Sequence, residues 1–178
     1  KTLNWLTIKA FPNIVKLYHE DKSIYSHFTH ELKNVLYICS TDSLTKKQIN
    51  IMLKQIKFLI TNKKINLDIY EQINQFIDSQ ENINQEDLID IVEMMIDKII
   101  CNKGNIWDYQ VIEGNNFWSP FKHLNSQNIS YKNIELIKKF LQELNKFNNK
   151  QKIQLSKVFL FNLYLISNES IKSLIKDF

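Results

Sequence analysis

Glycine, proline, alanine and arginine are scarce or missing in this chain of 178 residues. It has 2 glycines, 2 prolines, a single alanine at Ala10 and no arginine, so all 23 basic residues are lysine. The phosphate-binding loops of Rossmann and P-loop folds need several closely spaced glycines, which argues against both nucleotide-binding classes. Without arginine the chain also lacks the usual bidentate reader of guanine and carboxylates, because lysine supplies only a point charge.

Cysteine and long apolar runs are scarce too. The 2 cysteines, Cys39 and Cys101, fall in apolar helical contexts, so they predict neither a disulfide framework nor a zinc site, and a reducing compartment is expected. No uninterrupted apolar stretch approaches the ~18 residues of a membrane span. Hydrophobic residues make up 44% and charged residues 24%, which is typical of a folded globular chain. Because the chain begins at Lys1, we expect it to be a piece of a longer protein.

Apolar residues recur at helical spacing along most of the chain. The pattern predicts one or two helices over residues 1–39, with Pro12 ending or restarting a helix there. The polar residues 40–43 are predicted to hold the N-cap of the next helix. Asn84 is predicted to cap a later helix, with acids in its first turn, and Gly104 to end it. The helices predicted after residue 39 cover residues 43–63, 68–80, 84–103, 131–147, 153–166 and 168–178.

One segment has the pattern of a β-hairpin. Residues 106–112 are rich in β-branched and aromatic side chains, residues 113–116 suit a turn, and a short return strand precedes Pro120. Three helices followed by a hairpin is the order of a winged helix. The predicted fold is therefore mainly α: a helical extension (1–40), a winged helix of three helices plus a β-hairpin (41–121), and a second helical, possibly winged-helix, module (122–178). An irregular helical domain with an incidental hairpin is the alternative.

Charge is unevenly distributed along the chain. Residues 79–113 hold 2 lysines and 8 acidic residues, whereas residues 114–178 hold 10 lysines and 4 acidic residues. The third helix of a DNA-binding winged helix enters the major groove, but here that helix carries carboxylates that phosphates would repel. This stripe predicts a surface for a protein partner, or else a solvated helix face. Its residues, at i, i+4, i+7 and i+11, are Glu86, Asp90, Glu93 and Asp97.

The second charged group is basic and lies near aromatic residues. Its lysines are candidates for contact with nucleic acid or an acidic partner, and the tryptophans could stack on exposed bases. The alternatives are solubility for the lysines and a place in the small core of the wing for the tryptophans. The candidates are Lys122, Lys132, Lys138, Lys139, Trp107 and Trp118.

Catalytic and metal-binding patterns are weak. His27 and His30 are spaced i, i+3, with His19 upstream, but no fourth ligand accompanies them. Nothing resembles a nucleophile–base pair, a phosphate loop or a zinc-protease motif. The sequence predicts no metal, no cofactor and no catalytic residue.

The segments 102–106 and 113–118 resemble one known family. An amphipathic helix ending in Lys103-Gly104, a strand, an acidic wing containing Gly114 and an Asn-plus-aromatic return strand are similar to the C-terminal tandem winged-helix region of the Stn subunit of the telomeric CST complex. That complex is related to replication protein A. The abundance of Asn, Gln and Ile resembles the ciliate, telomerase-associated form. The order of elements matches over about residues 40–178.

The resemblance implies a non-catalytic scaffold in the nucleus, at telomeres. Its partners would be the large CST subunit, the DNA polymerase α–primase machinery or telomerase components, with weak, non-specific contact to single-stranded DNA and no membrane. Two other functions stay open: a PCI-type winged-helix scaffold subunit of a large assembly, and a lysine-rich module that binds nucleic acid non-specifically. Upstream helical repeats would favour the first, and strongly salt-dependent binding would favour the second.

Overall fold

The computed structural model is mainly helical. It describes residues 2–21, 26–62, 65, 68–101, 131–146, 149 and 169–176, and within these ranges no residue is in a β-strand. The chain divides into two compact units, residues 1–87 and residues 88–178. No helix in the described ranges has the length and hydropathy that crossing a bilayer requires.

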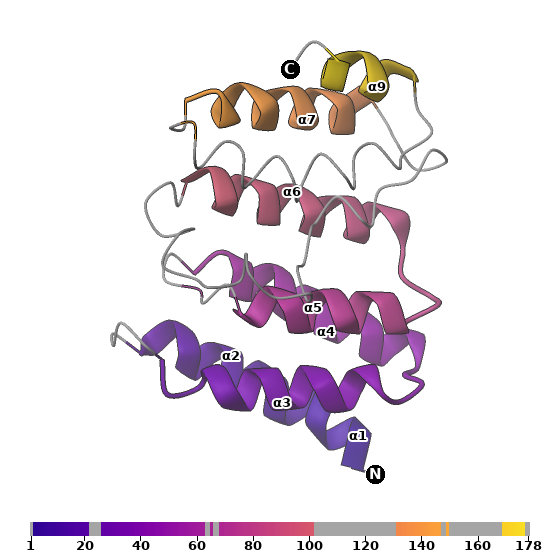
Figure 1. The fold of residues 1–178 in the computed structure, drawn as a ribbon. Coiled ribbons are helices and arrows are strands. Elements are labelled where there is room, and N and C mark those ends of the chain that lie inside the picture. The colour runs from indigo at the N-terminus through magenta and orange to yellow at the C-terminus, as the bar shows by residue number, and fades with distance from the viewer. Residues whose placement is uncertain are drawn as a thin grey trace. The chain divides into compact units, whose positions relative to one another are not determined.

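The first unit consists of stacked helical hairpins. In Figure 1, α2 and α3 form one hairpin and α4 and α5 form the next. Helix α2 packs against α4, and α3 packs against α5. The first helices of the two hairpins therefore lie side by side, and so do the second helices. Stacked hairpins of this kind are the building unit of α-solenoids. The bounds are α1 Thr2–Trp5, a π-helix η1 Leu6–Ala10, α2 Phe11–Glu20, α3 Thr29–Ser40, α4 Lys46–Ile60 and α5 Asp68–Ser79.

Hydrogen bonds between helix ends set the register of this stack. His19 Nε2 donates to the carbonyl oxygen of Phe58 (2.9 Å), and Asn62 Nδ2 donates to that of Tyr18 (3.4 Å), so the carboxyl ends of α2 and α4 lie together. Gln80 Nε2 donates to the carbonyl oxygen of Cys39 (3.2 Å), which joins the ends of α5 and α3. The Tyr18 and Cys39 carbonyls are among those that a helix end leaves without an intrahelical partner, whereas the Phe58 carbonyl also accepts from Thr61. Because the helices of each pair also pack together, both pairs run parallel.

Apolar side chains from all four of these helices form one core. Removing a Leu, Ile, Met or Phe side chain from water contributes about 1.5–3 kcal/mol. The helices before residue 41 therefore fold together with α4 and α5. Among the largest side chains that are almost completely buried are Phe11, Leu32, Leu36, Ile49, Met52, Leu53, Ile56, Tyr70 and Phe76.

Pro12 was predicted to end or restart a helix, and it does so only in the sense that the α-helical pattern begins again beside it. Helix α2 begins at Phe11, with Pro12 in its first turn, directly after the π-helical η1. Pro12 has no N–H to donate, and its ring would clash with the carbonyl four residues earlier in an α-helix. The wider π-turn, in which the Phe11 N–H donates to the Leu6 carbonyl, brings the chain past this point without a break.

The predicted N-cap of α4 within residues 40–43 is wrong. Thr45 is the N-cap: its hydroxyl accepts from the Gln48 N–H (3.4 Å), while Gln48 Oε1 accepts from the Thr45 N–H (2.9 Å). This reciprocal pair is a capping box. Ser40 and Thr41 instead finish α3, since their hydroxyls donate to the carbonyls three residues earlier, at 2.7 and 2.9 Å.

Helix α6, Gln85–Cys101, leads from the first unit into the second, which also contains α7 (Tyr131–Leu144) and α9 (Glu169–Lys176). Helices α7 and α9 pack together and bury Ile137, Phe140, Leu141 and Ile171. The predicted helices over 84–103, 131–147 and 168–178 are confirmed within a few residues at each end. The predicted hairpin at 106–118, the helix at 153–166 and Gly104 lie outside the described residues, and the three domain boundaries stay predictions.

Replacing Gln80 by Ala is expected to lower the free energy of unfolding by about 1–3 kcal/mol, because it leaves a buried carbonyl without its donor. The side chain is only 8% exposed and donates to the Cys39 carbonyl. Urea denaturation monitored by circular dichroism measures the change.

The matched control for this substitution is Gln75→Ala, which removes an exposed glutamine from α5. It should change stability by less than about 0.5 kcal/mol. Equal effects of the two substitutions would show that the link between α3 and α5 does not matter for stability.

Candidate interaction surfaces

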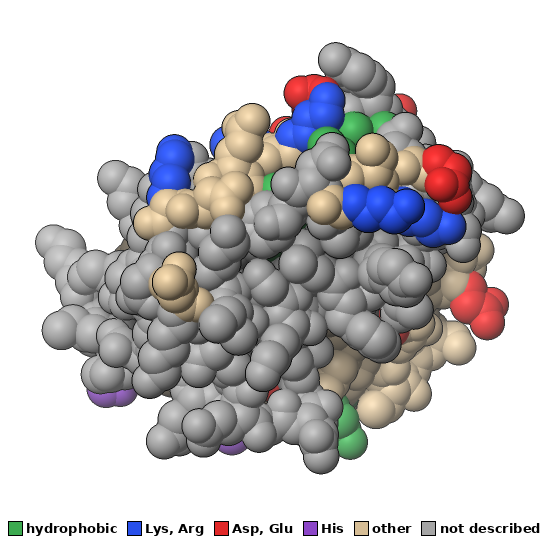
Figure 2. Space-filling model, turned by 45° about the horizontal axis from the view of Figure 1, so that its top comes forward, with side chains coloured by type: hydrophobic (Ala, Val, Ile, Leu, Met, Phe, Trp, Pro, Cys, Tyr) green, Lys and Arg blue, Asp and Glu red, His purple; other side chains and the backbone are tan. Residues whose placement is uncertain are grey.

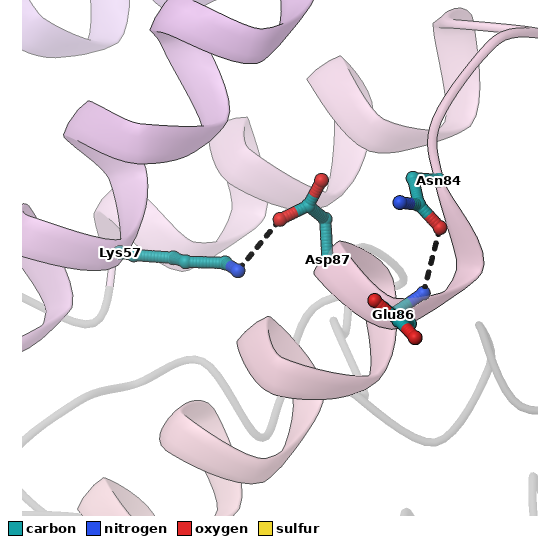
Figure 3. A network of polar contacts seen from close by, with 4 residues as sticks. All are labelled: Lys57, Asn84, Glu86 and Asp87. Carbon is teal, nitrogen blue, oxygen red and sulfur yellow. Dashed lines mark hydrogen bonds and ion pairs between the residues drawn. The ribbon is translucent and has the colours of Figure 1, made fainter.

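The start of α6 is fixed by polar contacts from two directions. Asn84 Oδ1 accepts from the Glu86 N–H at 3.1 Å, which confirms the predicted N-cap. Lys57 Nζ of α4 lies 2.7 Å from Asp87 Oδ1, and the two side chains are 26% and 33% exposed, so this ion pair is largely shielded from water (Figure 3). The carboxylate in the first turn also faces the positive end of the helix dipole. These contacts hold the beginning of α6 against α4.

The predicted acidic stripe does not have one uniform environment. Glu86 and Asp90 are exposed, whereas Glu93 and Asp97 are half-buried. Asp97 Oδ1 lies 2.6 Å from Lys139 Nζ of α7, with the side chains 46% and 55% exposed. The sequence assigned Asp97 and Lys139 to two different surfaces, yet they pair within the second unit. Binding of a protein partner to this stripe stays a prediction. Its most exposed carboxylates are those at the start of α6.

The predicted basic group is only partly within the described residues. Lys132 lies in α7, Lys138 pairs with Glu135 of the same helix at 2.6 Å, and Lys139 pairs with Asp97. On the face shown in Figure 2, the described lysine side chains at the top and at the right lie close to carboxylates, whereas one at the upper left does not. Such pairing lowers the positive charge that α7 offers to a phosphate backbone. Lys122, Trp107 and Trp118 lie outside the described residues.

Within the described part of the chain, the side-chain pKa values of Cys39 and Tyr70 are shifted from their usual range. Burial, with a smaller contribution from the nearby Asp42 carboxylate, raises the pKa of the Cys39 thiol to about 11. Burial, followed by the neighbouring Tyr18, raises the pKa of the Tyr70 phenol far above its usual range. A buried thiol that stays protonated is a poor nucleophile, so Cys39 is a core residue.

His19 stacks on Phe58, with ring centroids 4.0 Å apart and ring planes inclined by 10°. Together with its hydrogen bond to the Phe58 carbonyl, this contact gives His19 a role in joining α2 to α4. In the described ranges no three His, Cys, Asp or Glu side chains lie close enough to hold a metal ion. His27 contributes its backbone N–H to Asp21 Oδ2, at 3.1 Å.

Sequence reasoning missed the opposite charges of two helices in the first unit. Helix α4 holds four lysines and no acidic residue, whereas α5 holds three acidic residues and no lysine. Helices α2 and α3 each hold one lysine and one acidic residue and are neutral, and the Lys16 ammonium nitrogen of α2 lies 3.8 Å from the Glu20 carboxylate of the same helix. A count of charge helix by helix would have found the difference between α4 and α5.

No protein-family model, curated protein or solved structure matches this chain. The segments similar to the Stn family, residues 102–106 and 113–118, lie outside the described residues. Function therefore has to be inferred from the stacked hairpins of the first unit and from the charged side chains on both units.

The Cys39 thiol is expected to react with a disulfide reagent about 100-fold more slowly at pH 8 than in the unfolded chain, because its thiolate fraction falls with the raised pKa. A Cys101→Ser variant isolates the signal of Cys39. Between pH 9 and about 11 the unfolded thiol ionises while the folded one does not, so stability should fall as pH rises through this window.

Cys39→Ala in the same Cys101→Ser background is the control for this loss of stability. It should lack the part of the pH dependence that the thiol contributes. Labelling of Cys39 in the native protein as fast as in guanidinium would contradict its assignment to the core.

Proposed function

We propose that this chain is a non-catalytic protein-interaction scaffold. The observation that carries the proposal is the stack of two helical hairpins in the first unit, where α2 lies along α4 and α3 along α5 over one apolar core. Stacked hairpins present continuous outer faces built from several helices, which proteins of this architecture use to bind partners.

We propose more specifically that this scaffold belongs to a telomere maintenance complex of the CST type in the nucleus. It would contact the large CST subunit, DNA polymerase α–primase or telomerase components. Support comes from the resemblance at residues 102–118 and from the three consecutive helices α4, α5 and α6 that precede this segment. In this proposal residues 106–118 form the wing of a winged helix.

A PCI-type scaffold subunit is the second candidate function. The order of elements in such subunits is a run of helical repeats that leads into a winged helix. Helices η1, α2 and α3 pack on α4 and α5 as a preceding hairpin would, which favours this candidate. Both candidates make the chain a scaffold, and they differ in the assembly to which it belongs.

The charged residues best suited to test partner binding lie at the start of α6. Asp97 is engaged by Lys139, so reversing its charge would break a contact inside the second unit. Glu86 and Asp90 are exposed on the same helix. A partner that reads them would carry lysine or arginine, and this complementarity would accelerate association more than it would tighten the complex.

The double substitution Glu86→Lys, Asp90→Lys is expected to reduce capture of the large CST-type subunit and polymerase α–primase by at least about tenfold, since attraction becomes repulsion at two positions. Purified partner subunits are mixed with the tagged chain, and bound fractions are measured at low and at physiological salt.

The matched control, Glu31→Lys, Asp42→Lys, changes the net charge equally at exposed positions near the two ends of α3 and should leave capture unchanged. Capture of proteasome-lid or initiation-factor subunits in place of CST subunits would move the assignment to the PCI-type candidate. Equal loss with both double variants would refute the role of α6.

Single-stranded DNA is expected to bind the chain only weakly and without sequence preference. With no arginine for base contacts and two α7 lysines already paired, the dissociation constant should lie at roughly 10⁻⁴–10⁻⁶ M at physiological salt and rise steeply with salt. Fluorescence anisotropy of labelled telomeric and scrambled strands measures this. Nanomolar binding that depends on sequence would instead support a nucleic-acid-binding module.

A further inference from the structure

We draw no further inference here: the strongest candidate, the exposed apolar side chains of Leu17, Tyr37 and Ile38 on the surface of the hairpin formed by α2 and α3, carries none because nothing in the structure shows what covers them.

Discussion

The first unit has no glycine with which to end its helices, and its structure depends on how the carbonyls at those helix ends are satisfied instead. A helix leaves its last carbonyls without partners, and a glycine with positive φ is a common way to satisfy them. None of the described residues has positive φ, and the helix ends are finished by side chains instead. Hydroxyls of Ser40, Thr41, Thr61 and Ser79 donate to carbonyls three residues earlier in their own helices. The amide or imidazole groups of His19, Asn62 and Gln80 donate across to neighbouring helices.

The hydrogen bonds that His19, Asn62 and Gln80 donate to neighbouring helices also fix the positions of those helices, which a glycine cap does not do. A glycine ends its own helix, whereas His19 and Asn62 tie the end of α2 to the end of α4 and so fix their relative height. Once the ends are aligned, the residues further back are aligned too, because both helices rise at the same rate. Register is set by polar contacts at one end of the stack.

Periodicity and capping residues in the sequence predicted those helices whose position depends only on residues nearby in the chain. The apolar period located α5 and α6, and Asn84 gave the start of α6, because capping depends on neighbours in the chain. The N-cap of α4 was misplaced because four polar residues in a row compete, and only the pairing of Thr45 with Gln48 decides between them. The π-turn before Pro12 was out of reach, since periodicity alone does not distinguish a restart from a break.

The candidate site was less predictable because charge on a surface depends on which helices become neighbours. The stripe on α6 could be read from its spacing, but the pairing of Asp97 with Lys139 joins residues 42 positions apart. No period within a single helix contains that information.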